Sequence, residues 1–408
     1  MRKIYLHVVV LLMGFLSANA QFKTPTAKAA ADSNGYQSRR LQIDEMNLVS
    51  AYYNQTGNNS AVTGGIGTEK LSDFANTMDL QLSKFNKKGK KNTFLFELGI
   101  DHYSSASSDK IDPSTISSAS SADTRIYPSL NWTQSNESTG NSFGFTGSYS
   151  REYDYQSIGG GFNLTRLSKN KNTQFDFKLQ AFLDTWTVIL PVELRPGNSN
   201  GNNHESRNEG TSPRNSFSSS FSLAQVINQK LQVILVVEPS YQKGLLATRY
   251  QRNYFTDGSL QAETLPGERY KLPIAARINY FATDQILLRT FYRYYMDNWG
   301  IRAHTAELEV PVKLNSFISV SPFYRYNKQT GTRYFAGYGQ HSPGASYFTS
   351  DYDLSTLNSD FFGAGIRLAP PKGVLGWQRI SMLELRYGHY SRSTGLASNV
   401  ISLNIKVK

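Results

Sequence analysis

Histidines that lie close to serine or aspartate are the side chains in this sequence with the clearest capacity for chemistry. His102 follows Asp101 and precedes Ser104, and His389 precedes Ser391. A histidine that takes the proton of a serine hydroxyl turns it into a nucleophile, and the two partners can lie far apart in sequence. Serine is abundant along the chain, so such pairs also arise by chance. We therefore assign no catalytic residue and expect a protein that is not an enzyme, with a hydrolase as the alternative.

A metal site is the second chemical possibility. Asp101, Asp109 and Asp112 form an acidic cluster around a run of serines, and oxygen-rich loops of this kind can bind Ca²⁺. Their spacing is not that of an EF-hand, and acidic side chains solvated in a loop are the simpler explanation. The chain has no cysteine, which excludes thiolate-bound metals and Fe–S clusters. Apart from this weak Ca²⁺ candidate, the sequence predicts no metal and no cofactor.

Residues 1–20 have the pattern of a secretory signal peptide. A positively charged start and a short apolar run precede a small-residue cleavage site that ends at Ala20. We expect cleavage near Ala20, a periplasmic lead-in over residues 21–42, and a single membrane domain over residues 43–408.

The rest of the chain carries the pattern of membrane-spanning β-strands. Mean hydropathy is −0.44, and no apolar run after the signal is long enough for a helix to span a bilayer. Instead, apolar and polar residues alternate in segments of about ten residues, as in 93–102, where Phe94, Phe96, Leu98 and Ile100 share one face. In a soluble β-sandwich such faces would meet each other, whereas in a barrel they face lipid. Because the alternation leaves no segment for helices or a second domain, it predicts an all-β, transmembrane antiparallel β-barrel.

Connections of two sizes alternate along the chain and predict the number of strands. The short connections are residues 86–92, 134–141, 168–172, 228–230, 283–285, 315–316 and 370–377. The other set, mostly longer and rich in Gly, Asn and Ser, is residues 54–67, 103–123, 153–157, 187–213, 243–267, 297–300, 328–356 and 391–395. Outer-membrane barrels have short periplasmic turns and longer outer loops. The pattern therefore predicts about sixteen strands, within a range of about 14 to 18.

Prolines inside the predicted strands are the main conflict with a continuous ladder. They are Pro128, Pro239, Pro273, Pro311 and Pro322. Proline removes a ladder donor, so each should lie near a rim, at a bulge or beside a locally broken pair.

Charged residues on the polar faces of the strands are predicted to point into the interior. These interior charges are Glu97, Asp101, Lys178, Lys271, Arg277, Arg289, Arg293, Glu307, Glu309, Lys313, Arg325, Arg367, Glu384 and Arg386. Basic side chains around a water-filled lumen favour anions. With Asp79 and Asp176, which also lie on the polar faces, these charges are nine basic to seven acidic, so cross-strand ion pairs could equally neutralise a packed interior. An anion pathway and a self-paired interior both remain open.

A glycine-rich block, SAVTGGIGTE at residues 60–69, is the most distinctive motif. Its hydroxyl-bearing residues, its glycines and its acid are Ser60, Thr63, Gly64, Gly65, Gly67, Thr68 and Glu69. Glycine permits positive φ and close approach of the backbone, and hydroxyls hydrogen-bond locally. The block therefore predicts either an ordered loop that narrows the barrel mouth or offers backbone N–H groups to an anion, or simply a tight loop.

Residues 44–73 and 99–112, which include this block, resemble the opening of domain of unknown function 3570. This is a family of exported proteins of Gram-negative bacteria thought to be outer-membrane barrels. The resemblance implies that fold and compartment and no catalytic residue. Thr56 stands where the family pattern has an acidic residue, so no ligand role is carried over to it. Family members are often encoded near flavin-transferring and thioredoxin-like envelope proteins, which implies envelope redox or lipoprotein partners.

The sequence thus predicts an outer-membrane barrel of a Gram-negative bacterium that acts as a passive pore or as a membrane platform for envelope partners. The alternatives are a hydrolase at the outer rim and a barrel whose outer loops bind a surface ligand. Export and the absence of a basic block interleaved with aromatic residues argue against nucleic acid as a partner. Outer-membrane lipid is a partner in every version.

Overall fold

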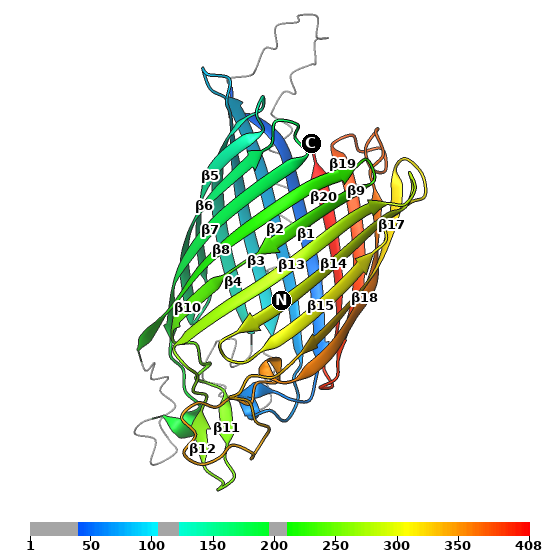
Figure 1. The fold of residues 1–408 in the computed structure, drawn as a ribbon. Helices are drawn as coiled ribbons and strands as arrows, with labels where there is room; N and C mark the ends of the chain where they lie inside the picture. The colour runs from blue at the N-terminus through cyan, green and yellow to red at the C-terminus, as the bar shows by residue number, and fades with distance from the viewer. Residues whose placement is uncertain (1–39, 105–121, 196–209) are drawn as a thin grey trace, which may run out of the picture. The chain divides into compact units, whose positions relative to one another are not determined.

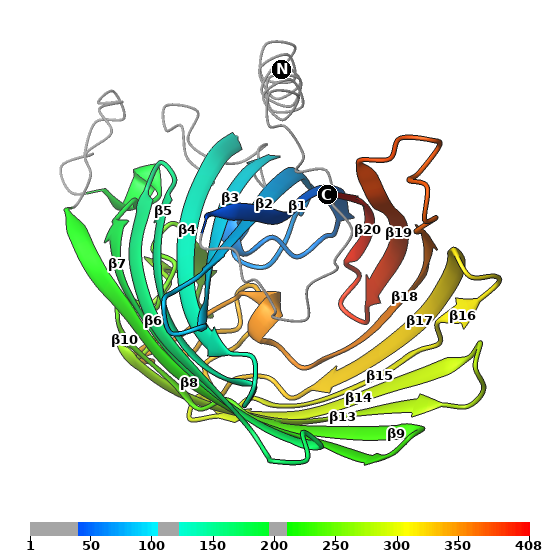
Figure 2. The same cartoon turned by 90° about the horizontal axis from the view of Figure 1, so that it is seen from above.

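The computed structural model describes residues 40–104, 122–195 and 210–408, so the predicted signal peptide lies outside the described residues. Eighteen strand segments form one sheet, which closes into an antiparallel barrel of sixteen strands (Figures 1 and 2). The first strand, β1 (Gln42–Thr56), pairs with β2 on one side and with the last strand, β20 (Ala397–Val407), on the other. No edge strand is left, and the predicted all-β barrel is confirmed.

The strands between these two follow one another in chain order around the ring. They are β2 (Leu71–Phe85), β3 (Lys91–Ser104), β4 (Ala122–Asn136), β5 (Asn141–Arg151), β6 (Tyr155–Leu167), β7 (Thr173–Thr187), β8 (Thr211–Asn228), β9 (Leu231–Val237), β10 (Ser240–Gly244), β13 (Glu268–Phe281), β14 (Leu287–Asp297), β15 (Arg302–Glu309), β16 (Val312–Lys313), β17 (Ile318–Gln329), β18 (Leu357–Leu368) and β19 (Ile380–Arg392). A separate hairpin of β11 (Arg252–Tyr254) and β12 (Leu260–Ala262) is not part of the barrel wall. The described loops also contain three short 3-10 helices, η1 (Ala61–Thr63), η2 (Val192–Leu194) and η3 (Tyr352–Leu354).

The prolines explain why eighteen segments make sixteen strands. Segments β9 and β10 are two parts of one strand that Pro239 interrupts, and Pro273 on β13 lies opposite this break. In the same way Pro311 separates β15 from β16, and Pro322 on β17 lies opposite that break. Pro128 falls in the gap in the pairing of β4 with β5. The expectation that strand prolines lie beside broken pairs is therefore confirmed.

The outward face of the barrel is apolar and is not covered by protein. Leu308, Tyr324 and Phe362 follow one another across β15, β17 and β18, and between 43% and 49% of each residue's surface is exposed. The hydrophobic cluster of fully buried residues lies instead among the loops, around Trp299. In a soluble sandwich these outward side chains would be buried between two sheets, whereas in a membrane barrel lipid is their solvent.

The two ends of the barrel differ in their connections, as predicted. Seven short turns lie at the end that carries the C-terminus, here called the short-turn end (Figure 1). Eight connections, most of them longer, lie at the opposite end, here called the long-loop end. No helix of the described chain is long and apolar enough to cross a membrane.

Three loops pack together across the long-loop end, and we call them the loop cap: residues 57–70, 245–267 and 330–356. Figure 2 shows the first and third of them inside the outline of the strand ring. Buried Leu246, Ala247 and Leu265 pack with Trp299 of the connection between β14 and β15. Thr332 donates a hydrogen bond to the Trp299 carbonyl at 2.9 Å, which holds the third loop to this cluster.

The assignment of faces predicts how charge substitutions affect folding. We expect Leu308→Arg to destabilise the barrel by roughly 2–4 kcal/mol, because it places a cation in hydrocarbon near the middle of a strand. The control Ser218→Arg, which adds the same charge on the inward face of β8, should cost much less. Urea titration of barrels refolded in lipid vesicles measures both. Equal costs would show that the faces are wrongly assigned.

Candidate functional site

The inward face of the barrel carries the predicted interior charges. Strand register places all of them on the face opposite Leu308 and Tyr324, as the cross-strand pairs Arg289 with Glu309 and Arg367 with Glu384 illustrate. Alternation along each strand therefore brings together side chains that are far apart in the sequence. The resulting lumen wall is the candidate functional site.

A network of ion pairs occupies the part of this wall formed by β14 to β19. Glu309 contacts Arg289 at 3.2 Å and Arg386 at 2.9 Å, and Arg386 also contacts Glu384 at 3.1 Å. A separate pair joins Arg325 to Glu307 at 2.5 Å. All three glutamates on this wall are thus already paired with a cation, and the pairs fix the arginine side chains along the wall.

Glycines on β18 leave room for the ion pair that spans the most strands, that of Arg386 with Glu309. Arg386 on β19 reaches Glu309 on β15 across β17 and β18, where Gly363 and Gly365 have no side chain on the lumen face. A Cβ on Gly365 would lie 3.0 Å from Cγ of Arg386. The arginine passes over the ring of Phe323, 5.4 Å from its centroid. A larger residue at Gly365 would therefore push Arg386 away from the wall, and one at Gly363 would clash with the backbone of β19.

Several lumen cations have no acidic partner. Lys178, Arg277, Arg293 and Arg367 are exposed and form no ion pair with another described residue. Arg277 and Arg289 line a cavity of about 310 Å³ along the wall, together with Glu307 and Glu309. Positive charge here is therefore open to the solvent of the lumen.

Acidic residues gather on a different part of the ring. Asp79 on β2 lies opposite Glu97 on β3, and Asp101 accepts a hydrogen bond from the Tyr127 hydroxyl at 2.9 Å. These side chains are half-buried, in contrast to the exposed arginines. In the ring of strands β14 lies opposite β3 (Figure 2). Asp79, Glu97 and Asp101 therefore face the arginines of β13 and β14 across the lumen.

The glycine-rich block of residues 60–69 forms an ordered loop in the cap. Helix η1 is followed by three glycines with positive φ, namely 84° at Gly64, 87° at Gly65 and 86° at Gly67. The N–H of Gly64 donates to the carbonyl of Ala61, and that of Gly65 donates to the carbonyl of Ser60. Because these two N–H groups are used within the loop, the block does not present them to an anion.

The block also packs closely against the hairpin β11–β12. A Cβ on Gly64 would lie 2.7 Å from the ring of Tyr254, and one on Gly65 would lie 3.0 Å from the Ser350 carbonyl oxygen. Arg252 donates to the Val62 carbonyl at 2.9 Å and pairs with Glu193 at 2.5 Å. Glycine at these two positions therefore permits both the positive φ and the close contact with the neighbouring residues. The block is therefore an ordered loop at the long-loop end, which is one of the arrangements considered from the sequence.

The other face of the hairpin buries an acidic residue that sequence reasoning missed. Glu263 is only 2% exposed and accepts hydrogen bonds from the Thr349 hydroxyl and the Thr248 N–H, each at 2.5 Å. Burial raises the pKa of Glu263 to about 8, and the nearby Asp351 adds to the effect. Burial likewise raises the pKa of Glu69 at the end of the glycine-rich block to about 7.

The histidines do not form the predicted hydrolase pairs. His389 lies on the outward face with Nδ1 2.9 Å from the Asn399 side-chain oxygen, and no contact with Ser391 is present. Nδ1 of His102 is 2.9 Å from the Thr124 hydroxyl, while Asp101 points to the opposite face. These contacts differ from the His389–Ser391 and His102–Asp101 pairs that the sequence suggested.

The predicted Ca²⁺ cluster cannot be assembled from the described residues. Asp109 and Asp112 lie outside them, and Asp101 faces the lumen and is bonded to Tyr127. Within residues 40–104, 122–195 and 210–408, no three histidine, cysteine or acidic side chains are placed to hold a metal ion.

Burial of Glu263 predicts a pH-dependent cap. The folded cap favours the protonated carboxyl, so its stability is complete below the ordinary pKa of 4.5 and declines as pH rises toward about 8. Opening, measured by hydrogen exchange corrected for intrinsic rates, should increase at least about tenfold between pH 5 and pH 8. In Glu263→Gln the amide can accept from Thr248 and donate to Thr349, so the part of this dependence that comes from Glu263 should disappear. The remainder comes from Glu69 and Asp351, whose pKa values burial also raises. An identical pH profile in the variant would contradict the explanation.

The chain is similar in fold to several solved structures. The ferric enterobactin receptor PfeA of Pseudomonas aeruginosa is 11% identical, with a TM-score of 0.45, over 87% of this chain and 54% of its own. OccK7 of the same organism is 8% identical, with a TM-score of 0.38, over 89% of this chain and 97% of its own. OccAB1 of Acinetobacter baumannii is 9% identical, with a TM-score of 0.37, over 89% of this chain and 95% of its own. This chain spans about half the length of the PfeA receptor.

A family model supplies the assignment. It is described as a protein of unknown function, DUF3570, and matches residues 102–374, from the end of β3 to the turn after β18. The match begins beyond the glycine-rich block and shares only residues 102–112 with the stretches on which the resemblance rested, so the body of the barrel carries most of it. No curated protein matches the sequence significantly. Since the match covers more than half of the chain, the protein belongs to the DUF3570 family.

Proposed function

We propose that this protein is a passive pore of the Gram-negative outer membrane that favours small anionic solutes. The loop cap would lie at the cell surface and the short-turn end in the periplasm, in keeping with the usual orientation of outer-membrane barrels. The cap narrows the outer mouth, and solutes pass along the charged wall. No step requires a catalytic residue or a cofactor.

The observation that carries this proposal is the unequal exposure of positive and negative charge. On the basic wall Glu307, Glu309 and Glu384 each contact an arginine. Arg277 and Arg293 are exposed and have no acidic partner among the described residues. A fully self-paired interior would leave no such cations. Solvated, unpaired cations attract mobile anions, which supports an anion pathway over a neutralised interior.

Opposed walls of different sign add a second effect. The acidic side chains on β2 and β3 and the arginines on β14 and β15 would orient a solute that carries both charges or a strong dipole. An anion would travel beside the basic wall. Such a lumen would select solutes by their charge and size without a specific binding site.

Ion selectivity in planar bilayers tests this function. The wild-type barrel should form channels whose reversal potential in a KCl gradient indicates preference for chloride. In Arg277→Gln with Arg293→Gln, the permeability ratio of chloride to potassium should fall on the order of twofold, since two unpaired lumen cations are removed.

A matched variant controls for the change in net charge. Lys87→Gln with Lys88→Gln removes two exposed cations from the turn after β2 and should leave selectivity unchanged. Equal effects of the two double variants would contradict a role for the lumen wall. Absence of channels at every pH would contradict the pore itself and leave the platform for envelope partners as the function to test.

A further inference from the structure

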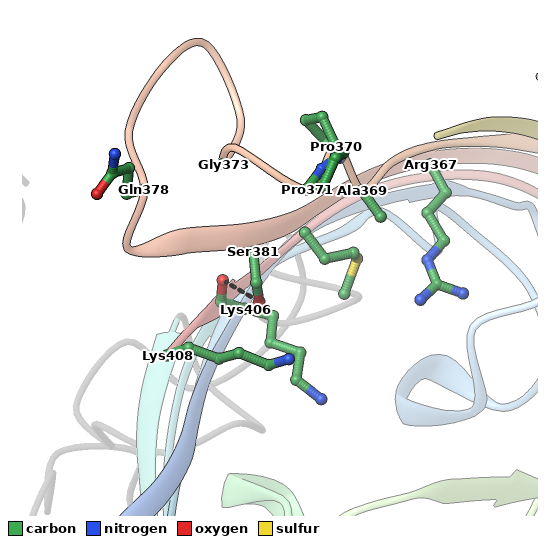
Figure 3. A pocket seen from close by; sticks show the side chains of 10 residues that line it. Arg367, Ala369, Pro370, Pro371, Gly373, Gln378, Ser381, Lys406 and Lys408 are labelled. Atoms are coloured by element: carbon green, nitrogen blue, oxygen red, sulfur yellow. Dashed lines mark hydrogen bonds between the residues drawn. The ribbon is translucent and has the colours of Figure 1, made fainter. Parts of the chain in front are cut away.

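A basic pocket lies at the short-turn end of the lumen, next to the end of the ion-pair network at Glu384. It is a cavity of about 370 Å³ between the ends of β18, β19 and β20 and the turn that joins β18 to β19. Arg367, Lys406 and Lys408 line it together with uncharged residues, and no acidic residue lines it. Figure 3 shows these three side chains extending on the same side of the strand wall.

Strand register explains why the three cations meet. Lys406 pairs with Met382, and Arg367 pairs with Glu384 two residues further along β19, so both cations point inward at neighbouring levels of the barrel. Lys408 is held nearby because its N–H donates to the Arg379 carbonyl at 2.9 Å. The cations therefore come from two strands and the residue after the last strand.

Neighbouring carboxylates only partly neutralise this charge. Lys406 contacts Glu45 at 2.5 Å, and this is the ion pair that reaches the pocket from β1. Glu384 lies opposite Arg367 but contacts Arg386 at 3.1 Å. Arg367 and Lys408 form no ion pair with any described residue. A surplus of positive charge thus remains on a concave surface.

The wall of the pocket is shaped before any ligand arrives. The Gly373 N–H donates to the Pro370 carbonyl at 3.0 Å, and the Val374 N–H donates to the Ile380 carbonyl at 2.9 Å. Val374 is 3% exposed, so the turn packs on itself. On the strand side, the Ser381 hydroxyl donates to the Lys406 carbonyl at 3.2 Å (Figure 3). A preformed wall fixes where the three cationic side chains begin, so only the side chains themselves must become ordered when an anion binds.

We propose that this pocket binds a small, multiply charged oxyanion, such as the phosphate or polycarboxylate group of a solute. Arginine offers a planar fork for two oxygens, and the lysines add point charges that can adjust to the anion. A monovalent ion such as chloride would gain little from three separated cations. The site does not depend on the proposed pore, because a barrel that never conducts would still present it to the periplasm.

Calorimetric titration of the whole barrel in neutral detergent with pyrophosphate tests the site. Saturable binding is expected at low ionic strength, and it should weaken at least tenfold in Arg367→Gln with Lys408→Gln. Arg367→Lys keeps the charge and loses the fork, so it should retain part of the affinity. The control Lys87→Gln with Lys88→Gln should bind as the wild type does.

Two results would overturn the proposal. One is no saturable binding of pyrophosphate by the folded wild-type barrel. The other is equal binding by the wild type and the Arg367→Gln, Lys408→Gln variant, which would place the anion elsewhere. If the barrel forms channels but does not bind pyrophosphate, this site is refuted and the proposed pore stands. If it binds pyrophosphate but forms no channels, the site stands and the pore is refuted.

Discussion

Closure of the backbone hydrogen-bond ladder is the constraint on which the rest of the structure depends. In hydrocarbon every N–H and C=O must find a partner within the protein, and a ring without edges provides one for each strand. The pairing of β1 with β20 completes that ring. The prolines show how strictly the rule holds, because Pro239 and Pro273 share one break and Pro311 and Pro322 share another. Each pair of prolines therefore interrupts the hydrogen-bond ladder at one place instead of at two.

Once the ring is closed, alternation along each strand decides where the charges go. A strand with lipid on one face must direct its polar side chains inward, so a barrel of this size collects many charges in a small volume. Pairing satisfies some of them, as Arg386 does by reaching two glutamates over glycine positions. Arg277 and Arg293 remain solvated because no described carboxylate lies within ion-pair distance of them. Function is therefore to be sought among the charges that folding leaves unpaired.

The sequence predicted those parts of the structure that depend on neighbours along the chain. Period-two alternation indicated the strands and their faces, and the rotation of short and long connections indicated their number. The glycine-rich block predicted positive φ at Gly64 and Gly65 but could not reveal the contact with Tyr254. Glu263 was missed because nothing beside it marks burial: its partners are Thr248, 15 residues earlier, and Thr349, 86 residues later. The basic pocket was missed for the same reason, since it requires the register of three strands.

The loop cap is held together in a different way from the wall it covers. Its apolar cluster is small, and it buries polar groups at a cost: Asn253 is fully buried, and neither polar atom of its side chain has a hydrogen-bond partner among the described residues. Glu263 adds a carboxyl that burial keeps from ionising. An element built in this way opens at a lower free energy than a continuous ladder. The long-loop end can therefore open while the ring stays closed, so the stability of the cap is separate from that of the barrel.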